Sequence, residues 1–182
     1  MSERTTHLLV DGENIDATLG GSVLGRRPHP EERPRWDRLI HHAEELWDQP
    51  VNGLFFLAAN EALPMPFVQA LLALGYRPVP LRGEGKVVDT AIQRTAEALQ
   101  SRDADVILVS HDADFVPQMT ALSETEGRRT AVFGFQEFMA SGLRAIPGIE
   151  VFDLEYDVNA FTSTLPRIRI IEIDEFNPLD FI

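Results

Sequence analysis

The stretch Asp105-Val106-Ile107-Leu108-Val109-Ser110-His111-Asp112-Ala113-Asp114-Phe115 decides the fold. Its first half is an unbroken run of Val, Ile and Leu, which is typical of a parallel strand buried on both faces. Its second half places two aspartates directly after that strand. Asp11 likewise follows a short apolar run at residues 8–10. Open α/β sheets build their sites at the carboxyl ends of strands, so we expect these carboxylates at one edge of one sheet.

The rest of the chain alternates between strand and helix periodicity. Strands are predicted over residues 7–11, 53–58, 76–81, 105–110, 130–133 and 150–154, and helices over residues 35–47, 67–74, 88–100, 115–124 and 136–145. Gly75 is expected to end the second helix in the left-handed conformation. The alternation predicts an α/β fold that is Rossmann-like and three-layered, with a mostly parallel central sheet and helices on both faces.

Three stretches fall outside this alternation. Residues 20–35 and 80–86 are rich in Gly and Pro and are predicted loops, and the first can bring Arg26, Arg27 or Arg35 over the carboxylates. A solvated insertion with scattered arginines is an equally good interpretation. Residues 167–173 alternate charged and aliphatic side chains, which indicates an edge strand. We therefore divide the chain into a domain at residues 1–158 and an acidic tail or docking extension at residues 159–182.

The composition limits the function classes. A net charge of −13 argues against a broad basic face that grips nucleic acid, although it does not exclude a nucleic-acid enzyme. No apolar run reaches the roughly 20 residues that span a bilayer, so no membrane partner is expected. The absence of cysteine fits a cytoplasmic location.

Four carboxylates are candidates for one metal site. If the strand at residues 7–11 and the strand at 105–110 are neighbours whose connections leave in opposite directions, Asp11, Asp112 and Asp114 face each other. Asp89 opens the helix predicted to begin on the same rim. Crowded carboxylates resist ionising together unless a cation joins them, and Mg²⁺ is the usual partner of such oxygen ligands.

Each motif also has a plain structural interpretation. Asp11 before glycine is a frequent turn, Asp89 is a common first-turn helix residue, and the pair at Asp112 and Asp114 can cap the next helix. Their coincidence at one sheet edge favours a site. His111 is expected to orient the loop backbone, because hard oxygen sites seldom recruit imidazole.

Taken together, three motifs resemble a known family. Val10-Asp11-Gly12-Glu13-Asn14, Lys86-Val87-Val88-Asp89 and Val109-Ser110-His111-Asp112-Ala113-Asp114-Phe115 are similar to the signature of NYN domains, the LabA-like branch of the PIN-like nucleases, over about residues 7–154. The resemblance implies Mg²⁺ or Mn²⁺ and phosphodiester hydrolysis, most often of RNA. It also implies an acidic site with two supporting residues: Asp11, Asp89, Asp112, Asp114, Asn14 and Ser110.

The sequence departs from the family at two positions. The family often has glycine where His111 stands and a further aspartate where Thr95 stands. The second departure removes a candidate ligand of a second metal ion.

The function predicted from these residues is a metal-dependent endoribonuclease-like hydrolase that cuts single-stranded RNA in preference to DNA. Asp11, Asp89, Asp112 and Asp114 would be both catalytic and metal-binding. Five residues are candidate substrate contacts: Asn14, Lys86, Ser110, Arg26 and Arg27. By analogy with the family, we also expect that the protein can form a homodimer.

Other functions stay open. An aspartate-nucleophile phosphohydrolase would need an aspartate where Glu13 stands, and a toprim-type enzyme would leave Lys86 and Asp89 without a role. The non-enzyme alternative is a catalytically weak or inactive NYN-fold binding module that docks a protein partner through residues 165–182. Phe176, Phe181 and neighbouring apolar residues could instead fold back on their own sheet.

Overall fold

The computed structural model describes residues 3–168 and 170–182. Its centre is a six-stranded sheet in the order β3-β2-β1-β4-β5-β6, and every neighbouring pair is parallel. The strands are β1 (Thr5–Asp11), β2 (Val51–Ala58), β3 (Arg77–Leu81), β4 (Ala104–Val109), β5 (Thr130–Gly134) and β6 (Glu150–Asp153). The predicted parallel α/β sheet is confirmed.

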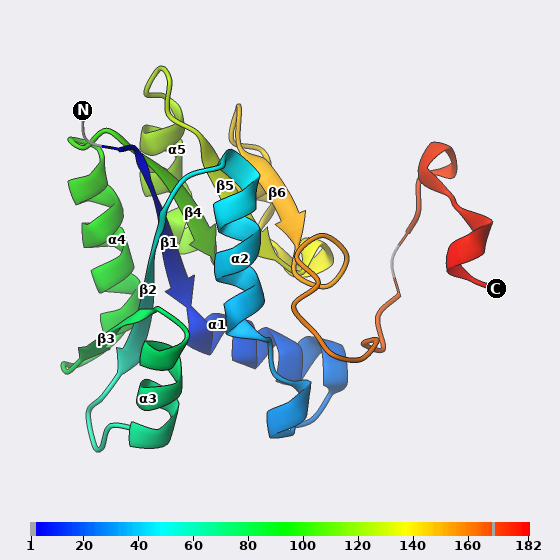
Figure 1. Cartoon of the computed structure of the whole chain (residues 1–182), viewed down its shortest axis with the longest axis horizontal. Coiled ribbons are helices and arrows are strands. Elements are labelled where there is room, and N and C mark those ends of the chain that lie inside the picture. Colours follow the sequence, from blue (N-terminus) through cyan, green and yellow to red (C-terminus); the bar gives the residue numbers. More distant parts are fainter. Residues whose placement is uncertain (1–2, 169) are drawn as a thin grey trace.

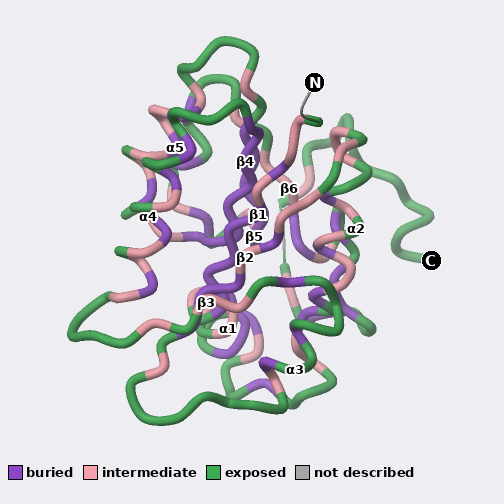
Figure 2. Tube along the Cα trace, turned by 60° about the vertical axis from the view of Figure 1, so that its left-hand side comes forward, coloured by how far each residue is buried: buried purple, intermediate pink, exposed green. Residues whose placement is uncertain are grey.

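Helices cover both faces of the sheet (Figures 1 and 2). They are α1 (Gly12–Thr18), α2 (Trp36–Trp47), α3 (Met65–Ala73), α4 (Val87–Leu99), α5 (Val116–Ser123) and α6 (Ser141–Arg144). Alternate residues of each strand point to opposite faces. In β1, Leu8 and Val10 therefore pack with α2 and α3, whereas Leu9 packs with α4 and α5.

The sheet reverses its direction of growth between β1 and β4. The chain adds β2 and β3 on one side of β1, and α4 then returns it to add β4, β5 and β6 on the other side. In the register of the two central strands, Val10 pairs with Val109. Such a switch point between neighbouring strands is where open α/β sheets bind ligands.

Two predicted segments differ from the structure. The helix predicted over residues 136–145 is divided into a 3₁₀ turn at Gln136–Phe138 and the short α6, because Met139 and Ala140 are extended. The loop predicted over residues 20–35 is partly helical: a π-helical turn spans Leu19–Leu24, and a 3₁₀ turn spans Pro30–Glu32. Leu19 and Val23 of the π-helical turn are both buried in the core that also contains α2.

The predicted edge strand at residues 167–173 is wrong for the described residues of that stretch; Arg169 lies outside them. None of these residues pairs with the sheet. Pro166 precedes the stretch, the Arg167 side chain turns into the body of the fold, and Ile168 and Ile170 are 95% and 97% exposed. The alternating sequence pattern of the described residues is therefore not accompanied by pairing with a neighbouring strand.

The C-terminal extension, residues 159–182, has two parts. Ala160, Phe161 and Leu165 belong to the core that also contains α2. Beyond Arg167 the chain projects away from the body of the fold (Figure 1). Phe176 and Phe181 stack on each other and stay largely exposed, so the expectation that they fold back on the sheet is not met. We call residues 168 and 170–182 the exposed tail.

Among the described residues, no helix has both the length and the apolar character needed to cross a membrane.

Candidate functional site

Asp11 lies at the centre of the switch point, at the end of β1. Its side chain is only 2% exposed. The Ser110 hydroxyl, just past the end of β4, donates to Asp11 Oδ2 at 3.0 Å. Asp11 also caps α1, since the backbone N–H of Asn14 donates to Oδ1 at 3.4 Å. The two central strands are thus joined at their carboxyl ends through one buried carboxylate.

Three further aspartates lie together at this edge, and we call Asp89, Asp112 and Asp114 the acidic trio. One carboxylate oxygen from each lies within 4.8 Å of the other two, which is close enough for a single metal ion to contact all three. Asp89 belongs to the first turn of α4. The other two belong to the loop after β4, where Asp112 accepts the backbone N–H of Asp114 at 2.9 Å.

Lys86, at the N-terminus of α4, is in contact with two members of the trio. Its ammonium Nζ is 2.9 Å from Asp114 Oδ2 and 3.7 Å from Asp89 Oδ2. The three surrounding aspartates raise the pKa of Lys86, with the hydrogen bond to Asp114 contributing most. Lys86 therefore stays charged and neutralises part of the trio.

The site as a whole retains uncompensated negative charge. The pKa of Asp11 is raised to about 6, mainly by burial; the charges of Asp89 and Asp112 contribute to the rise, and the Ser110 hydrogen bond opposes it. Burial and the charge of Asp112 also raise the pKa of Asp89, although Lys86 opposes them. Aspartates ordinarily titrate near 4, so Asp11 and Asp89 hold their protons more tightly than free aspartates do.

His111 holds the loop after β4 against α1. Its Nε2 accepts the backbone N–H of Phe135 at 2.7 Å, so the ring proton must reside on Nδ1. Nδ1 then donates to Asn14 Oδ1 at 2.8 Å, and the His111 backbone N–H donates to the same oxygen at 2.9 Å. Burial lowers the pKa of His111 to about 4, so the ring is neutral at physiological pH. It orients the loop and does not face the trio's carboxylates with a free nitrogen.

The surroundings of His111 explain two sequence features. A Cβ atom on Gly134 would lie 2.9 Å from the ring atoms Cδ2 and Nε2, so glycine makes the space that the imidazole occupies. The backbone carbonyl of His111 accepts the N–H of Ala140 at 3.1 Å, which holds residue 140 extended and interrupts the helix predicted there. Neither feature was predictable from local periodicity.

The two neutral residues predicted as substrate contacts are both turned inward. Ser110 is fully buried, and its Oγ accepts the Asp112 backbone N–H at 3.2 Å while it donates to Asp11. Asn14 uses its side-chain oxygen for His111. Both side chains thus contact residues of the site itself.

The arginines predicted to reach the site make other contacts. Arg26 forms two 2.7 Å hydrogen bonds to Glu32 within its own loop, and Arg27 is exposed. Arg35 lies 3.8 Å from Asp37. Thr95, where the family often has an aspartate, donates back to Ala91 O in α4 at 2.8 Å.

Comparisons with known proteins agree with this fold. The family model described as NYN domain matches residues 5–148. A crystal structure of a protein of unknown function from Vibrio parahaemolyticus is similar to this chain with a TM-score of 0.65 and 17% sequence identity, covering 83% of this chain and 94% of that one. At that identity the likeness shows the fold alone. No curated protein matches the sequence.

Proposed function

Because the chain belongs to the NYN domain family, whose fold is of the PIN-like nuclease type, we propose that it is a metal-dependent nuclease that hydrolyses phosphodiester bonds in single-stranded RNA. The observation that carries the proposal is the acidic trio beside buried Asp11 at the switch point of the sheet. All four aspartates would take part in catalysis, with Asp89, Asp112 and Asp114 as the metal ligands and Asp11 behind them.

The residues fit a hard divalent cation such as Mg²⁺ or Mn²⁺. All the candidate ligands are carboxylate oxygens, which these ions prefer. After burial, the like charge of Asp112 helps to raise the pKa of both Asp11 and Asp89, so Lys86 does not remove all the repulsion among these carboxylates. The acidic trio would hold the ion, and Asp11, one contact away through Ser110, would adjust the charge behind it.

When bound, such an ion would polarise a phosphoryl oxygen and lower the pKa of a water molecule, so that no protein nucleophile is required. The chain's own residues supply position and charge. Ser110 and Asn14 hold Asp11 and the loop after β4, and we therefore assign them a supporting role. Lys86 is 71% exposed and would exchange its carboxylate partners for a substrate phosphate as a point charge.

Single-stranded RNA is the preferred substrate because the resemblance to NYN domains favours RNA and because an acidic protein binds the phosphates of a duplex poorly. A net charge of −13 disfavours close contact with the phosphates along a double helix. Arg26 and Arg27 would have to leave Glu32 or approach from their exposed loop to contact the strand. A cytoplasmic location and a homodimer stay predictions.

The test is cleavage of labelled single-stranded RNA and DNA of equal sequence, with Mn²⁺, with Mg²⁺ or with chelator. We expect wild type to cut RNA only with a metal ion, and Asp112→Asn and Asp89→Asn to lose at least about 100-fold in rate. The matched control is Glu126→Gln, which removes an exposed acid at the opposite edge of the sheet and should cut at the wild-type rate. Equal rates for wild type and Asp112→Asn would exclude this site as the catalytic one.

A second candidate is supported by the exposed tail. Ile168, Ile170, Ile173, Leu179 and Ile182 are all more than 70% exposed, and acidic residues lie between them. Isolated apolar residues on a surface are ordinary, whereas a contiguous group marks an interaction site. On this proposal the chain is a catalytically inactive binding module whose tail docks a protein partner. It predicts that wild type leaves RNA uncut under every metal condition.

A further inference from the structure

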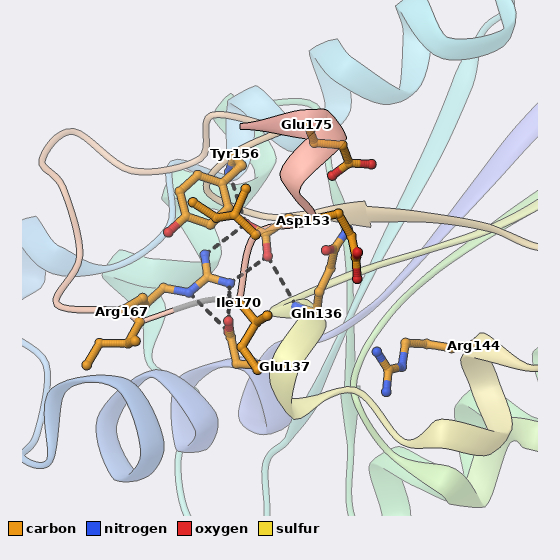
Figure 3. Close-up of a pocket in the computed structure, with 11 residues that line it drawn as sticks. Gln136, Glu137, Arg144, Asp153, Tyr156, Arg167, Ile170 and Glu175 are labelled. Carbon is orange, nitrogen blue, oxygen red and sulfur yellow. Dashed lines mark hydrogen bonds and ion pairs between the residues drawn. The ribbon is translucent and has the colours of Figure 1, made fainter. Parts of the chain in front are cut away.

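Arg167 is a buried arginine outside the matched NYN domain. It follows Pro166 in the C-terminal extension, yet its side chain is only 2% exposed. Figure 3 shows the guanidinium between Asp153 and Glu137, with Tyr156 beside it. Nη2 lies 2.6 Å from Asp153 Oδ1 and 2.6 Å from Glu137 Oε1, and Nη1 lies 3.1 Å from Glu155 Oε1. The extension is thus locked into the fold by one cation among three carboxylates.

The carboxylates around Arg167 belong to the carboxyl edge of the sheet. Asp153 is the last residue of β6, and it also accepts the backbone N–H groups of Gln136 at 3.2 Å and Tyr156 at 3.0 Å. Removing one partner of a buried ion pair leaves an uncompensated charge, which is strongly unfavourable. The backbone at residues 135–137 therefore depends on Arg167 for its position.

Arg167 is connected to His111 by a series of side-chain contacts through Phe135. The guanidinium carbon lies 4.8 Å from the centre of the Phe135 ring. Phe135 is fully buried and is parallel to the His111 ring, with an interplanar angle of 5° and 5.7 Å between centres. The same residue's backbone N–H donates to His111 Nε2 at 2.7 Å. Phe135 thus fixes both the plane and the tautomer of the imidazole.

From His111, the series of contacts continues through Asn14 to the acidic residues. The ring and the backbone N–H of His111 both donate to Asn14, whose own backbone N–H donates to Asp11. The residue after His111 is Asp112 of the acidic trio. Each link is a buried or half-buried contact between neighbours, so a shift at one end has few ways to relax.

We propose that Arg167 is a positioning residue for the acidic site: through Phe135 it holds His111, and through His111 it sets the loop that carries Asp112 against the Asn14 end of α1. This proposal rests on the proposed function, because the positioned groups are its metal ligands. It makes residues 159–167 part of the functional unit although the family match ends at residue 148.

The opposite end of the sheet offers a matched control. Arg129 likewise pairs with a buried aspartate, Asp105, at 2.9 Å, and its guanidinium carbon likewise lies over an aromatic ring, that of Trp47, at 5.3 Å. Asp105 is at the amino end of β4, whereas the acidic site is at the carboxyl end. Arg129→Met thus removes the same two kinds of interaction, from a side chain that is 43% exposed, without touching the site.

The experiment compares full-length wild type, Arg167→Met, Arg167→Lys and Arg129→Met. Hydrogen–deuterium exchange over residues 12–18 and 110–115 reports the position of the two segments without any metal or substrate. Calorimetric titration with Mn²⁺, well below the melting temperature of each variant, measures the affinity of the acidic site for the ion. We expect Arg167→Met to exchange faster in both segments and to bind Mn²⁺ about tenfold more weakly, the low end for groups that orient metal ligands. Arg167→Lys should lie between it and wild type.

Arg129→Met should match wild type in both readouts despite losing thermal stability. If Arg167→Met loses stability but keeps wild-type exchange at residues 110–115, or keeps wild-type Mn²⁺ affinity, Arg167 is only a structural anchor. Should Arg167→Met fail to fold, Arg167→Lys decides by the same criteria. If wild type itself binds no Mn²⁺, the proposed function fails, and the exchange data alone decide whether Arg167 positions the loop.

Discussion

Asp11→Asn should make the metal-free protein more stable at pH 8. Burial, assisted by the charges of Asp89 and Asp112, raises the pKa of Asp11 from 3.8 to about 6. A carboxyl whose folded pKa exceeds its unfolded pKa contributes its full stability below the unfolded value and loses it as the pH rises through the folded value. Above about pH 6 the ionised Asp11 therefore has a higher free energy in the folded protein than in the unfolded chain, which lowers the stability of the fold.

The structure sets the size of the effect. A rise from 3.8 to about 6 is roughly two pKa units, and at about 1.4 kcal/mol per unit it bounds the effect at roughly 3 kcal/mol. Asparagine keeps an oxygen that can accept the Ser110 hydroxyl, but its NH₂ group brings donors that lack an assured acceptor in this buried position. We therefore expect Asp11→Asn to gain about 1–2 kcal/mol in free energy of unfolding at pH 8 and almost nothing at pH 4.

Urea denaturation of wild type and Asp11→Asn between pH 4 and pH 8, with chelator throughout, measures this difference. Repeating the pH 8 series with Mn²⁺ should reduce or reverse it, because a bound cation stabilises the wild-type charge by mass action. Asp105→Asn provides the contrast. Burial alone would raise the pKa of Asp105, but hydrogen bonds from Arg4 and Arg129 outweigh it and lower the pKa to about 2.

Asp105→Asn should therefore be less stable than wild type at pH 8, and the wild-type advantage should disappear only as the pH falls toward 2. The reasoning fails if Asp11→Asn is no more stable than wild type at pH 8 in chelator. It also fails if the gain is the same at pH 4 and pH 8.

Three further predictions concern other parts of the molecule. Lys86→Met should bind Mn²⁺ about two- to fivefold more tightly by calorimetry, because an exposed competing cation is removed, yet cut RNA more slowly; weaker Mn²⁺ binding would contradict the account. Gly134→Ala should lose about 1–3 kcal/mol in urea denaturation and slow cleavage, since the new methyl group would meet the buried His111 ring; wild-type values in both would contradict it. Ile170→Ser and Phe181→Ser should change the free energy of unfolding by less than about 0.5 kcal/mol, and a larger loss would show that the exposed tail packs on the body.

The sheet was predictable because strand periodicity and strand-helix alternation are local signals. The apolar run before Ser110 is typical of a buried strand, and its fully buried residues confirm that prediction. The sequence left the adjacency of β1 and β4 as a condition for a site at the switch point, and the sheet order meets that condition. The meeting of Asp89 with Asp112 depends on that topology.

What local patterns could not supply were contacts between distant segments. Residues 167–173 alternate as an edge strand would, but the ion pairs of Arg167 prevail over periodicity. The break before α6 depends on a hydrogen bond from Ala140 to His111, which lies far away in sequence. Ser110 and Asn14 were predicted as substrate contacts from residue type alone. In the structure their side chains turn inward and bond to neighbouring residues of the site, which depends on the same packing.

The most direct test of the central claim is the position of a bound ion. A crystal of the wild-type protein soaked in Mn²⁺ would give an anomalous difference map that locates the metal without assumption. We predict a peak in contact with Asp89, Asp112 and Asp114, with the Lys86 ammonium displaced from its bridging position. A map with no peak there while Lys86 still bridges Asp114 and Asp89, at Mn²⁺ concentrations that fill other sites, would contradict the claim.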